Sequence, residues 1–187
     1  TEELLFIESR ECADVLAQTA GELIYISYDD KMYVSLAGDI YAIDLNIKSV
    51  ETLTENLRAG AYLISRAGDM IAWQHGEDRF SSTQITTMDM KTGVRHTYSA
   101  KAGEYLRPLG FSGDDFIYGV CSEGDVAEDF AGNTLFPMHR VEIVDSRGEL
   151  IRNFDYLSKN KYVVSATMEN NRINLQCISI RIFFKQM

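Results

Sequence analysis

The 187-residue chain has little proline, few cysteines and no long apolar run. With only 2 prolines and 13 glycines, it is not a collagen-like or Pro/Gly-rich disordered chain. No apolar run approaches the roughly 20 residues that cross a bilayer as a helix, so we expect no membrane insertion. The cysteines Cys12, Cys121 and Cys177 are odd in number and far apart. We therefore expect free, buried thiols and neither a zinc site nor a disulfide framework.

Basic residues are scarce too. The chain has 18 Lys and Arg against 28 Asp and Glu, which gives a net charge of −10. Nucleic acid is not an expected partner, because phosphate binding needs clustered basic side chains, and anionic membrane surfaces are disfavoured for the same reason. The acidic residues are locally concentrated. Six lie between Gly113 and Phe130 with no base among them: Asp114, Asp115, Glu123, Asp125, Glu128 and Asp129.

A repeat runs through the chain. Apolar or alternating segments end at Asp44, Asp89 and Asp145, which are 45 and 56 residues apart, and each is followed by a polar turn. Gly–Glu, Gly–Asp or Asn–Asn pairs at 21–22, 68–69, 113–114 and 170–171 keep a similar spacing and predict tight hairpins. Because the aspartates recur once per unit at a strand end, we interpret them as turn caps and not as catalytic carboxylates.

Each unit predicts four strands. The expected strands are 61–65, 70–74, 83–89 and 94–98 in the second unit and 105–110, 116–121, 139–145 and 150–154 in the third. In the first unit they are 13–18, 23–28, 40–44 and 50–53, with 32–36 as an extra β-prone stretch. The larger spacing of the third unit comes from a polar insertion at 122–133. The units span about 11–55, 60–100, 104–156 and 160–187, with one further strand at 4–8, in a single domain.

Four-stranded antiparallel units of about 45 residues are the blades of a β-propeller. We therefore predict an all-β fold of antiparallel four-stranded blades, a partial or small propeller of about four blades. Two arrangements remain open. The strand at 4–8 can complete the fourth unit and close a small ring, or the chain is an arc of a larger propeller. In an arc, an open edge strand would favour pairing between chains.

One segment carries a family resemblance. Met88-Asp89-Met90-Lys91-Thr92-Gly93 resembles the repeats of TolB-like and quinoprotein-like propellers, whereas the turns after Asp44 and Asp145 depart from that form. More narrowly, the run of residues at 106–118 and 135–143 resembles uncharacterised propeller-like surface proteins of Gram-positive gut bacteria. This resemblance implies an extracellular or cell-surface location, and it brings no active site with it.

Two stretches are candidate ligand-binding regions. The loop after the second strand of unit two carries Trp73, His75 and Asp78, which can form a platform for sugar or peptide, although the tryptophan can instead pack between blades. The acidic insertion contributes Asp125, Glu128 and Asp129, which form either a solvated loop or a site for a cation or basic surface. Its spacing is not that of an EF-hand. We add His139 as a further candidate.

No catalytic motif is present, and no two histidines lie at ligand spacing, so we predict no catalytic residue, metal ligand or cofactor. The sequence favours a non-enzymatic β-propeller binding or scaffold module for a protein, peptide or glycan. The alternatives are the propeller domain of a larger enzyme and a sensor ectodomain. All three rest on fold-level analogy.

Overall fold

The computed structural model describes residues 7, 12, 14, 23–57, 60–76, 78–169 and 172–179. Of the predicted strands, 4–8 and 13–18 lie outside the described residues except at positions 7 and 14. The first blade contains β1 (Ile24–Ile26), β2 (Lys31–Leu36), β3 (Asp39–Asp44) and β4 (Ser49–Thr54). The second contains β5 (Tyr62–Ile64), β6 (Met70–Gln74), β7 (Gln84–Asp89) and β8 (Arg95–Ser99). The third contains β9 (Glu104–Ser112), β10 (Asp115–Ser122), β13 (Met138–Val144) and β14 (Leu150–Asp155).

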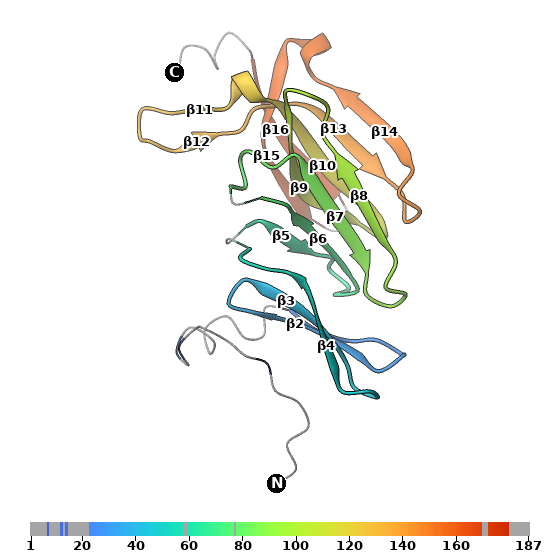
Figure 1. Ribbon diagram of the computed structural model, residues 1–187. Helices are drawn as coiled ribbons and strands as arrows, with labels where there is room; N and C mark the ends of the chain where they lie inside the picture. The colour runs from blue at the N-terminus through green and yellow to red at the C-terminus, as the bar shows by residue number, and fades with distance from the viewer. Residues whose placement is uncertain are drawn as a thin grey trace.

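The blades stack face to face. Each is a four-stranded antiparallel sheet in which neighbouring strands follow one another along the chain, and the three fan out in chain order (Figure 1). The hairpin of β15 (Lys161–Glu169) and β16 (Arg172–Ser179) is joined to the third sheet through one residue pair between β15 and β13. The prediction of an all-β fold with four-stranded antiparallel blades is confirmed, and the described part is an open, partial propeller.

Residue alternation explains the stacking. In the second blade Met70, Ala72 and Ile85 join the core shared with the third blade. Their neighbours Ile71 and Trp73 join the core shared with the first blade. Because successive side chains of a strand point to opposite faces, a blade between two others must be apolar on both. For that reason all five residues of β6 are buried.

The recurrent aspartates cap turns, as the repeat predicts. The Oδ1 atom of Asp44 accepts the backbone N–H of Asn46 at 3.0 Å, and that of Asp89 accepts the N–H of Lys91 at 2.8 Å. The Oδ1 atom of Asp145 accepts the N–H of the residue two positions on, at 2.9 Å. The same Asx-type geometry thus closes the loop after the third strand of every blade.

The first blade corrects one strand assignment. The segment at 23–28 contains its first strand, β1, and not its second, and the stretch at 32–36 is a regular strand, β2. The hairpin between β1 and β2 turns at Asp30, which adopts a φ of 57°. Aspartate tolerates this left-handed conformation but is a weaker sequence marker than glycine. The marker at 21–22 therefore shifted the alignment of this unit by one strand.

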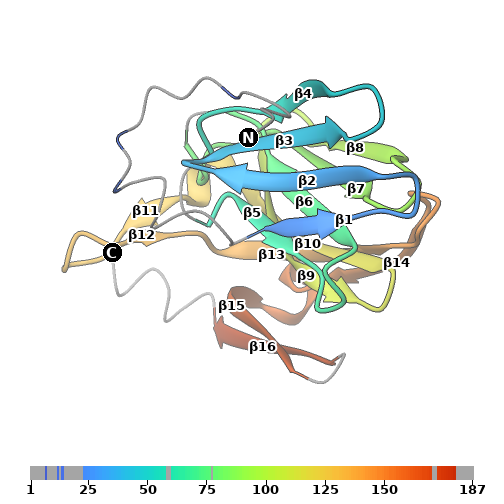
Figure 2. The ribbon, with the colours of Figure 1, turned by 90° about the horizontal axis from the view of Figure 1, so that it is seen from below.

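The insertion of the third blade folds into an arm. After β10 come a short 3₁₀ helix, η1 (Glu123–Asp125), and two strands, β11 (Ala127–Glu128) and β12 (Thr134–Leu135). β11 and β12 pair only with each other, and the hairpin projects away from the blades (Figures 1 and 2). The insertion is therefore ordered, and we call its β11–β12 hairpin the arm.

The hairpin β15–β16 covers the outer face of the third blade. Val163 pairs with Met138 of β13, and both are buried in a cluster with Ile117, Cys121 and Val141. Its other face is polar over most of its length: Ser165, Thr167, Glu169, Arg172, Asn174 and Gln176 are all exposed. The blades carry apolar side chains on both faces, so this hairpin has the composition of a cap.

The cysteines differ in environment. Within the described residues all three thiols are free: Cys12 is exposed, Cys177 is partly buried and Cys121 is fully buried. Burial raises the pKa of the Cys121 thiol to about 12. The expectation of buried thiols therefore fails for Cys12.

We expect iodoacetamide to alkylate Cys12 rapidly in the native protein and Cys121 slowly, because the thiolate is the reactive form and Cys121 is both covered and protonated. Peptide mapping by mass spectrometry over a time course measures both rates. Denaturant should bring the two rates together. Equal rates without denaturant would contradict the burial of Cys121.

Candidate functional site

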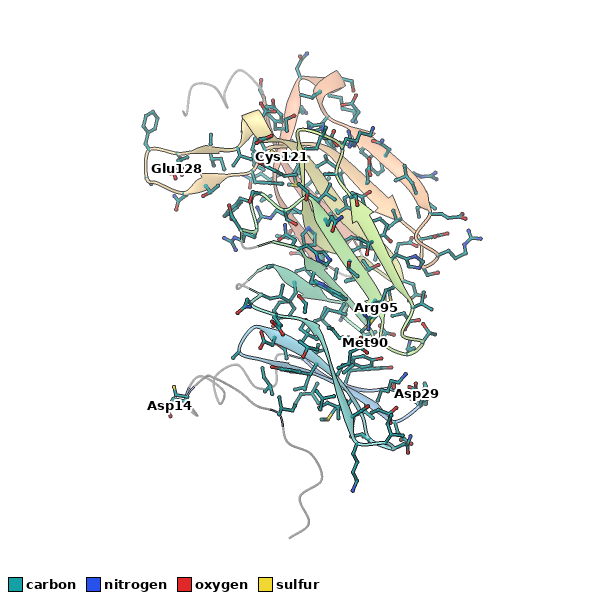
Figure 3. All side chains as sticks on the ribbon, in the orientation of Figure 1. Asp14, Asp29, Met90, Arg95, Cys121 and Glu128 are labelled. Carbon is teal, nitrogen blue, oxygen red and sulfur yellow. The ribbon has the colours of Figure 1, made fainter. Side chains whose placement is uncertain are left out.

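The arm and the loop at 75–83 enclose a cleft of about 620 Å³ at one end of the second and third blades. Its acidic side chains come from the loop (Asp78), from η1 (Glu123) and from the arm (Glu128). The lining is completed by Phe80, Ser81, Tyr105, Val126, Ala127 and Thr134, and it contains no Lys or Arg. Figure 3 shows Glu128 on the arm and Cys121 at its base.

A buried glutamine fixes the loop wall of the cleft. The Nε2 atom of Gln74, at the end of β6, donates to the carbonyl oxygen of Arg79 at 2.9 Å and to that of Leu106 in β9 at 2.8 Å. The Oδ1 atom of Asp78 accepts the N–H of Phe80 at 3.0 Å and closes a tight turn. The loop is therefore tied to the third blade across the blade boundary.

The arm wall is fixed at its base. The N–H of Glu123 donates to the carbonyl oxygen of Gly103 at 2.9 Å, which ties η1 to the start of the third blade. The hydroxyl of Tyr162 in β15 donates to Asp125 Oδ2 at 2.9 Å. Burial and this hydrogen bond raise the pKa of Tyr162 to about 12, so it remains a donor at neutral pH. Both walls thus start from anchored segments.

The cleft has acidic groups in its lining and two arginines next to its aromatic residue Phe80. On its surface, the hydrogen bond to Glu123 and burial raise the pKa of Tyr105. The guanidinium groups of Arg79 and Arg107 lie 4.7 and 5.6 Å from the centre of the ring of Phe80, a residue of the lining. Burial and the nearby charge of Arg79 lower the pKa of Arg107. The two arginines pack against Phe80, whereas the charged groups of the lining itself are carboxylates, so the lining presents negative charge and apolar area.

The structure brings two predicted regions together. Asp78 and Glu128, from separate candidate stretches, line the same cleft. Asp125 lies behind the arm wall and accepts from Tyr162. Asp129 lies in the turn of the arm, where its Oδ1 accepts the N–H groups of Ala131 and Asn133. The side-chain amide of Asn133, together with these backbone N–H groups, lowers its pKa.

Three other candidates lie elsewhere. Trp73 is 2% exposed between the first two blades, in keeping with the packing interpretation. His75 is exposed as a whole residue, but its Nε2 lies 2.7 Å from Thr86 Oγ1 in a part-buried contact, and this partial burial of the ring lowers its pKa. His139 is 7% exposed within a charged network of the third blade. None of the three lines the acidic cleft.

Arg140 is the centre of that network. It makes a paired contact with Glu104, at 3.1 and 2.9 Å, and its Nε donates to Glu142 at 2.7 Å. Tyr118 donates to the same Glu142. Burial and the charge of Arg140 lower the pKa of His139, against the opposing effect of Glu104. The histidine is therefore neutral near pH 7 and part of the blade interior.

Sequence reasoning missed Tyr105, Val126 and Thr134 as cleft residues. Tyr105 is an ordinary strand residue, and only the stacking of β9 beside the loop at 75–83 places it there. In the part of the chain that the structure describes, no three His, Cys, Asp or Glu side chains are placed to hold a metal ion. No described helix is long and apolar enough to cross a membrane.

Comparisons with known proteins find similar solved structures at low identity. No family model and no curated protein matches the chain. Among solved structures, it is similar to the extracellular domain of a putative one-component system from B. thetaiotaomicron, with 11% identity and a TM-score of 0.42 over 81% of this chain. It is also similar to Hsv2 of Kluyveromyces lactis, with 16% identity and a TM-score of 0.35 over 78% of this chain. TolB from Acinetobacter baumannii is similar as well, with 17% identity and a TM-score of 0.28 over 80%.

The chain spans only part of these proteins: 18% of the first, 45% of the second and 49% of the third.

Proposed function

We propose that the chain is a non-enzymatic binding module whose acidic cleft takes up a cationic segment of a protein or peptide. The observation that carries the proposal is the lining: it holds three carboxylates, one from the loop at 75–83 and two from the insertion at 122–133, and no base. Apolar groups beside them, Phe80 and Val126, suit the aliphatic stem of a lysine or arginine, which packs while its charged head meets a carboxylate. Arginine suits such a site especially well, since its planar head matches a carboxylate in two contacts.

The proposed setting is outside the cell or at the cell surface, as the resemblance to propeller-like surface proteins implies. Surface biotinylation of intact cells that produce the native protein tests this part separately. If a known surface protein is labelled and this protein is not, the proposed location is wrong, and the proposal for the cleft is unaffected.

Fluorescence anisotropy with a labelled arginine-rich peptide tests the cleft. Asp78→Asn and Glu128→Gln each remove one charge from an exposed wall residue, so we expect each to weaken binding by about two- to fivefold. The affinity should also fall as salt is added, because the contacts are solvent-accessible.

The matched control is Asp114→Asn, an exposed acid in the turn between β9 and β10, outside the cleft. It removes the same charge and should leave the affinity unchanged. An equal loss in all three variants would mean that only net charge matters. If a glutamate-rich peptide bound with the same affinity as the arginine-rich peptide, the proposal would be wrong.

A further inference from the structure

The tip of the arm exposes a large apolar side chain. Phe130 is 87% exposed, more than any other phenylalanine among the described residues. An aromatic ring of this kind gains by burying 150–250 Å² on contact with a partner. It does not line the acidic cleft, so the proposed function does not account for it.

The turn that carries Phe130 is held in one shape. Asp129 Oδ1 accepts N–H groups at 2.8 and 2.9 Å, and the side-chain amide of Asn133 donates to Asp129 Oδ2 at 3.0 Å. Gly132 follows with a φ of 80°, a conformation that glycine adopts without strain. A pre-shaped turn loses little entropy when its tip is bound.

A pocket of about 320 Å³ lies at the opposite end of the blades. It is lined mainly by apolar groups, Leu63, Ile64, Leu109, Phe111 and Met168, together with Gly110, Ser65 and Arg66. The direction of β9 fixes its position. Glu104 at the start of β9 pairs with Ser122, from which the arm emerges, whereas the pocket lies at residues 109–111. Six residues of strand separate them by ~20 Å, so an arm that projects from the other end does not reach its own pocket.

The charges near Phe130 and near the pocket are complementary. Phe130 directly follows Glu128 and Asp129, and Arg66 at the pocket rim is exposed. A phenylalanine that enters the pocket would bring these carboxylates toward that guanidinium. The net charge of −10 opposes contact between copies and limits its strength.

We infer that Phe130 of one copy inserts into the Leu63–Leu109–Met168 pocket of a second copy, so that molecules associate head to tail. The two surfaces differ, so the contact is heterologous: in a pair one molecule keeps a free pocket and the other keeps a free arm, and further copies can add at either end. An interface built around a single side chain is far below the roughly 1,200 Å² of stable complexes, so the association is weak and concentration-dependent.

Sedimentation velocity over a rising protein concentration tests the inference. We expect the wild-type sedimentation coefficient to increase with concentration and Phe130→Ser to reduce the association constant at least about tenfold, as for an anchor residue. Phe154→Ser is the matched control, since it removes a phenylalanine that is 40% exposed on β14 and should leave the association intact. A wild type that stays monomeric at every concentration would overturn the inference.

Mixing two variants tests the head-to-tail geometry. Phe130→Ser keeps the pocket, and Leu63→Glu keeps the arm but places a charge in the pocket. Each alone should be monomeric, and their mixture should form pairs that do not grow further. Arg66→Glu replaces the second variant if circular dichroism shows that Leu63→Glu does not fold. Association that survives Phe130→Ser, or a mixture of folded variants that stays monomeric, contradicts the inference whatever the peptide assay shows.

Discussion

Replacing Arg140 with methionine should lower the free energy of unfolding by about 2–4 kcal/mol at pH 7, slightly less than for a fully buried pair because about a sixth of each side chain remains exposed. The variant leaves Glu104 and Glu142 charged in the blade interior without their shared cation. Urea unfolding followed by far-UV circular dichroism measures the loss.

The pH dependence of this loss has a definite sign. In the wild type, burial raises the pKa of Glu104, but the hydrogen bond and charge of Arg140 outweigh it and hold that pKa below its usual range. The wild type therefore loses this contribution as pH falls through the lowered pKa. Without Arg140, burial raises the pKa of Glu104 above its unfolded value, and the folded variant binds a proton more readily. The difference in the free energy of unfolding between wild type and variant should therefore become smaller as the pH falls.

Two further variants complete the experiment. Arg147→Met removes an exposed arginine that pairs with Asp145, and it should leave the stability nearly unchanged. Adding Glu104→Gln and Glu142→Gln to Arg140→Met removes the unpaired charges and should recover much of the loss. If the difference in the free energy of unfolding between wild type and Arg140→Met did not depend on pH, the cause would be lost packing of the arginine stem and not charge.

Replacing Phe116 with alanine should cost about 3–5 kcal/mol. Phe116 is 1% exposed, and its ring centroid lies 5.2 Å from that of Phe111, 5.7 Å from that of Tyr118 and 5.8 Å from that of Tyr98. Tyr98 belongs to the second blade and the other two to the third, so the substitution removes one ring of an aromatic cluster that joins the blades. Thermal and urea unfolding both measure the effect.

The control is Phe154→Ala on β14, where the ring is 40% exposed and the expected loss is much smaller. If Phe116→Ala cost no more than Phe154→Ala, the boundary between the second and third blades would not contribute to stability as its packing indicates.

Much of the fold follows from local sequence signals. Alternating apolar residues predicted the strands of the second and third blades, because buried side chains must recur every second position. The capping role of Asp44, Asp89 and Asp145 also followed, since an Asx turn needs only residues close in sequence. The first blade was misaligned because Asp30, and not glycine, adopts the left-handed turn.

The candidate site was less predictable. Asp78 and Glu128 were each singled out, but their meeting in one cleft depends on blade stacking, which pattern alone does not give. The pairing of Glu104 with Arg140 is similarly hidden, because the two residues are 36 positions apart on strands separated by β10. The Phe130 turn carried a local signal, Asp129 with Gly132, but nothing local reveals the pocket at the far end.

The thin cover of the third blade has a kinetic consequence. In the part of the chain that the structure describes, the strands β15 and β16 lie over the Cys121 side of that sheet, and one residue pair of the main-chain ladder, Met138 and Val163, joins them to it. Such a unit can open while the three blades stay folded. The slow alkylation of Cys121 then reports how often the β15–β16 hairpin opens. We expect the free energy of this local opening to be lower than the free energy of global unfolding. The alkylation rate of Cys121 is therefore a measure of the local stability of this hairpin, separate from the stability of the three blades.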